Sequence, residues 1–241
     1  MPLYLVPTPL GNLGDLTPRA LEILRAAPVL AAEDTRTARR LFSAMNIPLA
    51  GRELLSYGDH NEAGMAARLV EHLKSGRDVA LFSESGTPLI SDPGFKVVRA
   101  ALEAGIPVVP LPGPCAAVTA LIASGLPVHA FSFHGFLPKK PGARGRLLAL
   151  LKDRPETLIF YESPQRVPKI WVELVEVFGA DRPACLAREL TKIHETFLRG
   201  TLSELEARVA GKDAVPLRGE CTLMIAGRSS TELEFDSASD E

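Results

Sequence analysis

The stretch that most constrains the fold covers residues 79–94 and reads VALFSESGTPLISDPG. Its first four residues, Val79 to Phe82, are all apolar, which is typical of a strand buried on both faces of a parallel sheet. Small polar residues follow, and Gly86 lets the backbone turn tightly and approach a ligand closely. Asp92 is placed to cap a helix over residues 95–103. Open α/β sheets bind ligands where such strands end, although an ordinary strand-to-helix turn has the same pattern.

The same strand, loop and helix order recurs along the chain. In the first half, apolar runs predict further strands at residues 3–6, 29–32, 54–56 and 108–109, alternating with helices. In the second half, runs containing aromatic residues predict strands at 131–136, 157–161, 185–188, 195–199 and 221–226, with helices at 144–152, 164–178 and 202–209. The sequence therefore predicts two α/β domains. We expect a mostly parallel sheet in residues 1–112, a mixed sheet in 113–228, and a disordered acidic tail at 229–241.

Composition narrows the class of protein. The chain has 241 residues, of which 46% are hydrophobic and 23% are charged, as in a globular protein. No apolar run reaches the roughly 18 residues that a membrane helix needs, and no apolar leader opens the sequence. The three cysteines have neither metal-binding nor paired disulfide spacing. We therefore expect a cytoplasmic protein with no metal site and no membrane association.

Charge is distributed unevenly along the chain. The net charge is −2, but the last thirteen residues contain five acids and no base, so the rest of the chain carries +3. Between residues 135 and 154 six bases stand against one acid, namely Lys139, Lys140, Arg144, Arg146, Lys152 and Arg154. Such a cluster is suited to contacting phosphate groups, and a solvated loop and helix face is the alternative.

Three stiff loops follow predicted strands, at residues 7–14, 83–88 and 110–117. Prolines fix the backbone of these loops, and glycines allow close approach. The sequence has neither the G-x-G-x-x-G fingerprint of dinucleotide-binding folds nor a P-loop. Rigid loops that present main-chain groups are suited to a ligand such as an adenosine-containing cofactor.

Nine motifs occur in a fixed order. They are LVPTPLGNLGD (5–15), AAEDTRTARR (31–40), DHNE (59–62), SESGTPLISDPG (83–94), VVPLPGPCAAVTAL (108–121), GFLPKK (135–140), LIFYESPQR (158–166), LARELTK (186–192) and RGE (218–220). With these motifs the chain resembles the tetrapyrrole methylase superfamily, in particular its members that methylate a cytidine 2′-hydroxyl of small-subunit (16S) ribosomal RNA. The resemblance covers nearly the whole chain except the acidic tail.

The resemblance implies a class III methyltransferase fold, with S-adenosylmethionine in a cleft between two α/β domains, rather than a classical Rossmann methyltransferase. It also implies a homodimer that acts on small-subunit ribosomal RNA or on the assembled 30S subunit. Carried over by position, the residues implied to contact the cofactor are Pro9, Leu10, Gly11, Glu84, Gly86, Thr87, Pro88, Cys115, Ala116, Tyr161, Glu162 and Glu220. Glu84 stands where that family typically has aspartate.

Methyl transfer to a ribose hydroxyl needs the hydroxyl oxygen, the methyl group and the sulfur to be aligned. It also benefits from a base that accepts the hydroxyl proton. Candidates at the predicted loop ends are Asp34, Asp59, His60, Glu62, Asp92, Glu162, Glu189 and Lys192, of which we favour His60 and Asp34. A helix cap is the alternative for Asp34 and Asp92.

The expected RNA contacts are basic residues, and pairing with nearby glutamates is their alternative. They are Arg36, Lys139, Lys140, Arg144, Arg146, Arg166 and Lys192. Two other functions stay open from the sequence alone. One is a small-molecule methyltransferase that acts on a tetrapyrrole, and the other is a non-catalytic adenosylmethionine-binding factor in ribosome assembly.

Overall fold

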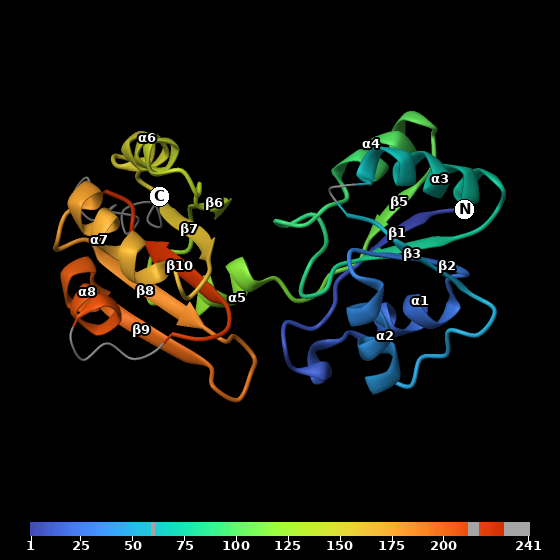
Figure 1. Ribbon diagram of the computed structural model, residues 1–241, viewed down its shortest axis with the longest axis horizontal. Helices are drawn as coiled ribbons and strands as arrows, with labels where there is room; N and C mark the ends of the chain where they lie inside the picture. Colours follow the sequence, from blue (N-terminus) through green and yellow to red (C-terminus); the bar gives the residue numbers. More distant parts are fainter. Residues whose placement is uncertain (59–60, 212–216, 229–241) are drawn as a thin grey trace, which may run out of the picture. The chain divides into compact units, whose positions relative to one another are not determined.

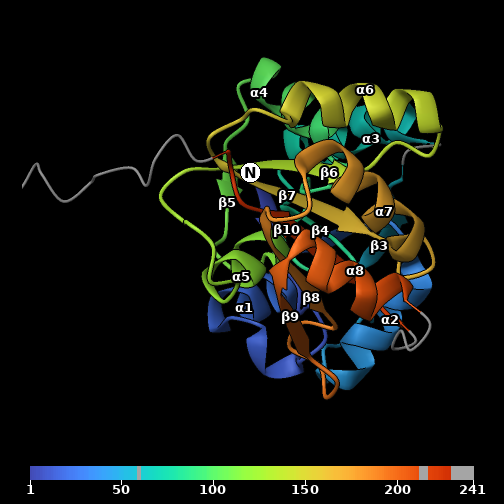
Figure 2. The ribbon, with the colours of Figure 1, turned by 90° about the vertical axis from the view of Figure 1, so that its left-hand side faces the viewer.

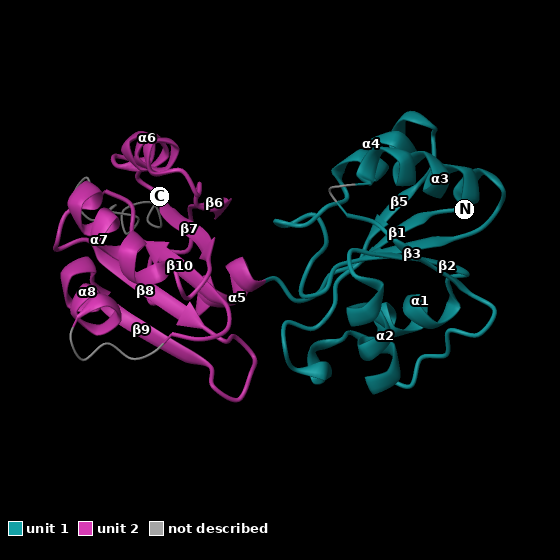
Figure 3. Ribbon diagram, viewed as in Figure 1, with its two compact units in different colours: residues 1–115 teal, residues 116–241 magenta. Residues whose placement is uncertain are grey.

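The computed structural model describes residues 1–58, 61–211 and 217–228, so the predicted tail at 229–241 lies outside it. The chain divides into two compact units, residues 1–115 and 116–241 (Figure 3). No helix among the described residues is long and apolar enough to cross a membrane.

The first unit contains a parallel sheet with the strand order β3-β2-β4-β1-β5. Its strands are β1 (Leu3–Val6), β2 (Val29–Ala32), β3 (Glu53–Ser56), β4 (Val79–Phe82) and β5 (Val108–Pro110). Parallel neighbours need crossover connections, and helices supply them. These are α1 (Pro18–Ala26), α2 (Thr35–Ala44), α3 (Glu62–Lys74) and α4 (Phe95–Glu103), with a 3₁₀ turn at Leu13–Asp15.

Both faces of this sheet are buried, which explains the unbroken apolar runs. In β4, Val79 and Leu81 pack into the cluster that contains α3 and α4, whereas Ala80 and Phe82 pack into the cluster that contains α1 and α2. Figure 1 shows these two helix pairs on opposite faces of the sheet. The prediction of a strand buried on both sides is therefore confirmed at β4.

The second unit contains a mixed sheet with the order β6-β7-β10-β8-β9, in which only the β6–β7 pair is parallel. Its strands are β6 (Phe131–Phe136), β7 (Thr157–Glu162), β8 (Pro183–Arg188), β9 (Thr196–Thr201) and β10 (Cys221–Ile225). Its helices are α5 (Ala116–Ile122), α6 (Pro141–Leu151), α7 (Val167–Phe178) and α8 (Leu202–Ala210). The described residues thus confirm an α/β fold with one parallel and one mixed sheet.

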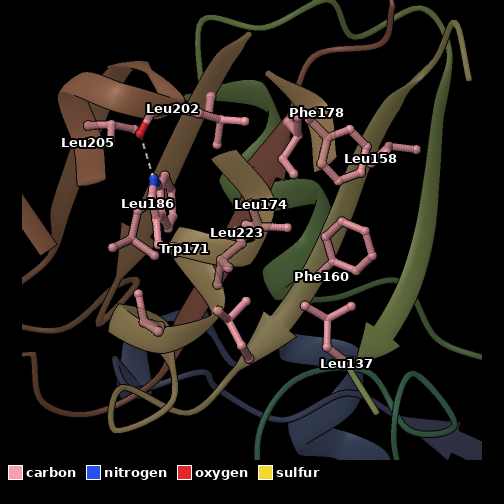
Figure 4. Packing of buried hydrophobic residues seen from close by; sticks show 14 of the residues in the cluster. Leu137, Leu158, Phe160, Trp171, Leu174, Phe178, Leu186, Leu202, Leu205 and Leu223 are labelled. Carbon is pink, nitrogen blue, oxygen red and sulfur yellow. Dashed lines mark hydrogen bonds between the residues drawn. The ribbon is translucent and has the colours of Figure 1, made fainter. Parts of the chain in front are cut away.

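Trp171 anchors the core of the second unit. Its ring is fully buried among Leu174, Leu186 and Leu205, and its indole N–H donates to the carbonyl of Leu202 at 2.9 Å (Figure 4). This bond ties α7 to the start of α8, and the two helices lie side by side (Figures 1 and 2). The Trp171 indole thereby finds the acceptor that a buried indole needs, while a capping box between Thr201 and Glu204 starts α8.

The prediction that Asp92 caps α4 is wrong. Gly94 is the N-cap residue, with φ of 145°, and it makes no side-chain cap. Instead Glu62, from α3, accepts hydrogen bonds from the backbone N–H groups of Gly94 and Lys96, each at 3.3 Å. A residue distant in sequence therefore satisfies the free amides of α4.

Two helix starts also differ from the prediction. α6 begins at Pro141 rather than Arg144, because proline is well tolerated in the first turn of a helix. α7 begins at Val167 rather than Pro164, because Ser163 to Arg166 form a turn in which the Ser163 carbonyl accepts from Arg166 and Val167.

Candidate functional site

Loops from two neighbouring strands join at the end of the first sheet where its strands terminate, here called the carboxyl edge. The backbone N–H of Thr8 donates to the Gly86 carbonyl at 2.9 Å, and the N–H of Gly86 donates back to the Thr8 carbonyl at 3.0 Å. The Thr8 hydroxyl also donates to the Ser83 carbonyl at 3.0 Å. Because β1 and β4 are adjacent and parallel, their following loops meet at one place.

The third stiff loop joins the same place. The Thr87 hydroxyl donates to the Pro114 carbonyl at 2.7 Å. A Cβ on Gly113 would lie 2.5 Å from the Cβ of Pro7, and one on Gly86 would lie 2.9 Å from Cδ2 of Leu10. Gly86 also has φ of 82°, which disfavours any other residue. The three loops predicted to be preshaped are thus brought together, with glycine required at two contacts.

The predicted cofactor-contacting residues fall into two groups, one in each unit. In the first unit, the loops that meet at the carboxyl edge carry Pro9, Leu10, Gly11, Glu84, Gly86, Thr87 and Pro88, and Cys115 is the last residue of that unit. The second unit carries Ala116, Tyr161, Glu162 and Glu220. There the Tyr161 hydroxyl accepts from the N–H of Ala117 at 3.0 Å, which ties β7 to α5.

Two of these second-unit residues differ in their surroundings. The Glu162 carboxylate is buried, and burial raises its pKa although the Ser163 N–H and Arg166 oppose the shift. Its Oε2 has no hydrogen-bond partner among the described residues. Glu220, by contrast, is exposed, and its carboxylate pairs with Lys192 at 3.0 Å.

Carboxylates gather at the carboxyl edge of the first sheet. Glu33 and Asp34 follow β2, Glu84 follows β4, and Asp92 precedes α4. Burial raises the pKa of Glu84, and the charges of Glu33 and Asp34 raise it further. Burial likewise raises the pKa of Asp92 from 3.8 to about 7, helped by Glu33 and Glu84. This edge therefore concentrates negative charge that a cationic ligand would relieve.

The cap alternative for Asp34 is confirmed. Its carboxylate accepts from the Arg36 N–H at 2.7 Å at the start of α2, and it pairs with the Arg36 guanidinium at 2.7 Å. The hydrogen bonds from Arg36 lower the pKa of Asp34 to about 2, which makes it a weak base. The other favoured residue, His60, lies outside the described residues, as does Asp59.

Asp92 suits proton transfer better than Asp34, because its pKa lies near neutrality. The sequence placed Asp92 among the candidates without favouring it. Its raised pKa depends on burial and on carboxylates from two other loops, so no local pattern could have favoured it over the other candidates.

The predicted RNA-contacting residues of the basic stretch are not equivalent. Lys139, Lys140 and Arg146 are exposed. Arg144 is only 3% exposed, and it donates to Glu173 at 2.6 and 2.5 Å and to the Pro138 and Lys139 carbonyls. These bonds use four of the five N–H groups of a guanidinium. We expected Arg144 to contact RNA from the protein surface. The structure corrects this expectation, because the side chain is buried and its hydrogen bonds hold α6 to α7 and to the preceding loop.

The other predicted RNA contacts also have protein partners. Lys192 pairs with Glu189 at 2.8 Å as well as with Glu220, so two carboxylates surround one ammonium. Arg166 donates to the Leu137 carbonyl at 3.0 Å and lies 3.3 Å from Glu162. Pairing with nearby glutamates, the alternative considered for these residues, is thus present, and their contact with RNA stays a prediction.

A family model described as "Tetrapyrrole (Corrin/Porphyrin) Methylases" matches residues 2–206, which span both units. The chain belongs to this methylase family. Membership fits the two-unit α/β architecture and the glycine- and proline-rich loops at the ends of its strands.

Relatives of this methylase carry a more specific name. A protein called "Ribosomal RNA small subunit methyltransferase I" from Micromonospora olivasterospora is 50% identical over 98% of this chain and 74% of its own length. A protein of the same name from Escherichia coli O157:H7 is 47% identical over 95% of this chain and 79% of its own length. The chain therefore belongs with this group of methylases.

Solved structures share the fold. Uroporphyrin-III-C-methyltransferase from Thermus thermophilus aligns with a TM-score of 0.65 and 26% identity, covering 93% of this chain and 94% of that one. A further structure of uroporphyrin-III C-methyltransferase from the same organism, complexed with S-adenosylhomocysteine, aligns with a TM-score of 0.62 and 22% identity, covering 94% of this chain and 97% of that one.

Proposed function

We propose that this methylase transfers a methyl group from S-adenosylmethionine to the 2′-hydroxyl of a cytidine in small-subunit ribosomal RNA. The observation that carries the proposal is 43–50% identity, over most of the chain, to proteins named for small-subunit ribosomal RNA methylation. The exposed cations Lys139, Lys140 and Arg146 support a substrate with a phosphate backbone, which RNA has and a tetrapyrrole lacks. A homodimer and the 30S subunit as substrate remain part of the proposal.

Two features of the carboxyl edge of the first sheet support cofactor binding there. Gly86 and Gly113 leave no room for a Cβ, so main-chain groups there are close-packed and rigid. Glu33, Glu84 and Asp92 supply negative charge there, and the pKa values of Glu84 and Asp92 are raised. S-adenosylmethionine carries a sulfonium and an ammonium, which such an edge would stabilise. We assign the loops at residues 7–14 and 83–88 to cofactor binding.

S-adenosylmethionine supplies a methyl group that is already activated, so the contribution of the protein is mainly alignment. Rigid loops reduce the entropy lost when the reacting groups are positioned. The Asp92 carboxylate is the proposed proton acceptor, because it lies at this edge and, before a cationic cofactor binds, burial raises its pKa to about 7, which makes it a stronger base than Asp34. Asp34 orders the start of α2 instead, since its low pKa and its bond to Arg36 suit a cap.

The test is transfer of a labelled methyl group to 30S subunits, to naked 16S ribosomal RNA, or to a tetrapyrrole precursor. We expect label in RNA, at a ribose that resists alkaline cleavage after the transfer. Label in the tetrapyrrole alone would favour a small-molecule methyltransferase. Cofactor binding without transfer to any of the three would favour a binding factor in ribosome assembly.

The cofactor loops are tested by Gly86→Val. A side chain at φ of 82° and 2.9 Å from Leu10 must displace the loop, so we expect binding of S-adenosylhomocysteine to fall below detection by calorimetry. Circular dichroism should show that the variant is folded. Gly51→Val is a matched control, because its φ is 74° but no atom lies within 4 Å of its Cβ. Wild-type affinity in Gly86→Val would refute the assignment.

A further inference from the structure

A cavity of about 240 Å³ lies in the second unit, lined by Lys139, Arg144, Gln165, Arg166, Lys169 and Ile170. Lys139 precedes α6, and the last four residues belong to the turn before α7 or to its first turn. A water molecule occupies about 30 Å³ in the liquid, so the cavity has room for a phosphate group together with several waters.

Two arginines build the wall of this cavity. Arg144 is held by Glu173 and by the Pro138 and Lys139 carbonyls, and Arg166 is held by the Leu137 and Pro138 carbonyls. Both guanidinium groups therefore fix the chain that carries Lys139. A lining whose parts are held in place loses little entropy when a ligand binds.

The charge of the lining is not balanced by the protein. Four cations line the cavity, while Glu173 pairs with Arg144 and Glu162 pairs with Arg166. Within the part of the chain that the structure describes, no carboxylate lies within ion-pair distance of Lys139 or Lys169. The Glu173 carboxylate attracts Lys169 at longer range but forms its ion pair with Arg144, so both ammonium groups can still contact an anion. The start of α7 adds the positive end of a helix dipole.

We propose that this cavity binds a phosphate group of the RNA backbone, with Lys139 and Lys169 as its charged contacts and Gln165 as a neutral donor. The inference rests on the proposed function for the identity of the anion as RNA. It changes the expected RNA surface in two ways. Lys169 and Gln165 are added to the residues expected to contact RNA, and Arg144 becomes a positioning residue that shapes the cavity.

The experiment compares two double variants of the full chain that remove the same charge. Lys139→Gln/Lys169→Gln removes the two cavity ammonium groups. Lys152→Gln/Arg154→Gln removes two exposed cations of the same basic stretch that lie outside the cavity lining. Binding of fluorescent 16S ribosomal RNA is measured by anisotropy from 50 to 300 mM salt, together with calorimetry of S-adenosylhomocysteine and of inorganic phosphate.

We expect the cavity variant to lose one phosphate contact. The salt slope of its RNA affinity should fall by about 0.7–0.9, and its affinity at 0.1 M salt should fall roughly fivefold. The control variant should change both quantities much less. S-adenosylhomocysteine affinity should be the same in all three proteins, which excludes misfolding of the cofactor site.

Several outcomes would overturn the inference. RNA affinity unchanged in the cavity variant, or lowered equally in the control, would show that the cavity is not a distinct contact. Phosphate binding that is lost in the cavity variant while RNA affinity persists would assign the site to free small anions. A wild-type protein that binds RNA but methylates neither RNA nor 30S subunits would refute the proposed function only, because the comparison of variants would still hold.

Discussion

Asp92 shows how tertiary surroundings set the chemistry of one residue. Burial, with the charges of Glu33 and Glu84, raises its pKa from 3.8 to about 7. A carboxyl group with a higher pKa in the folded chain binds its proton more tightly there, so its contribution to stability falls as pH rises between the two values. We expect Asp92→Asn to gain stability relative to wild type as pH rises from about 4 to about 7.

Urea denaturation at intervals across that pH range would measure this gain. Asp181→Asn replaces an exposed aspartate of the second unit and serves as the control, for which we expect no such trend. A constant difference between Asp92→Asn and wild type at all pH values would contradict a raised pKa for Asp92.

Gly113 tests the packing of the loops at the same residue scale. Its added Cβ would lie 2.5 and 2.8 Å from the Cβ and Cγ of Pro7, and a proline ring cannot swing away. We expect Gly113→Ala to lower the free energy of unfolding by about 1–3 kcal/mol. Gly64→Ala, in α3 with no atom within 4 Å of its Cβ, should raise it by up to about 1 kcal/mol. Denaturation curves in which both variants shift in the same direction would contradict the packing.

At the scale of elements, Glu62 connects two helices. Its carboxylate at the start of α3 accepts from the Tyr57 hydroxyl at 3.2 Å and from the Gly94 and Lys96 N–H groups that begin α4, and it pairs with the Lys96 ammonium at 3.1 Å. Burial favours the neutral acid, but these contacts outweigh it and hold the pKa of Glu62 below 4.5.

We therefore expect Glu62→Gln to cost about 1–2 kcal/mol of unfolding free energy at pH 7. Because the pKa is lowered in the folded chain, the contribution is present above about pH 4.5 and is lost as pH falls through the folded value. Glu71→Gln, on the exposed side of α3, is the control. Hydrogen exchange of the first amides of α4 should also speed up in Glu62→Gln, and unchanged exchange there would argue against the cap.

Elements with a local signal could be predicted from the sequence. The apolar runs of β1, β2 and β4 match the structure residue for residue. The loop contacts between Thr8, Gly86 and Pro114 could be anticipated only as three stiff loops, because their meeting depends on strand order. The cap from Glu62 and the burial of Arg144 had no local signal, since their partners lie 29 or more residues away.

At the scale of the whole molecule, the two units carry opposite local charge. The carboxyl edge of the first unit gathers Glu33, Glu84 and Asp92, whereas the second unit carries the cavity with Lys139 and Lys169. The acidic edge would thus attract the cationic groups of the cofactor, and the basic cavity would attract an RNA phosphate. This division predicts that added salt weakens RNA binding steeply and cofactor binding only slightly.

The chain has cysteines in both units, and their reactivity can be compared in one experiment. Cys185 and Cys221 are buried in the second sheet, and burial raises their pKa values to about 11 and about 12. Cys115 is half-buried, is the last residue of the first unit, and directly follows Pro114 in the loop at residues 110–117. Since the thiolate is the reactive form, we expect a thiol reagent at pH 8 to modify Cys115 first in the folded protein.

If Cys115 also belongs to the cofactor site, saturating S-adenosylhomocysteine should slow its modification severalfold, as measured by mass spectrometry of timed samples. The buried pair provides an internal control, because their modification requires opening of the second unit whether or not a ligand is bound. Equal protection of all three thiols would show that the ligand acts by stabilising the whole fold rather than by covering Cys115. Unchanged labelling of Cys115, under conditions where calorimetry shows binding, would place the cofactor elsewhere.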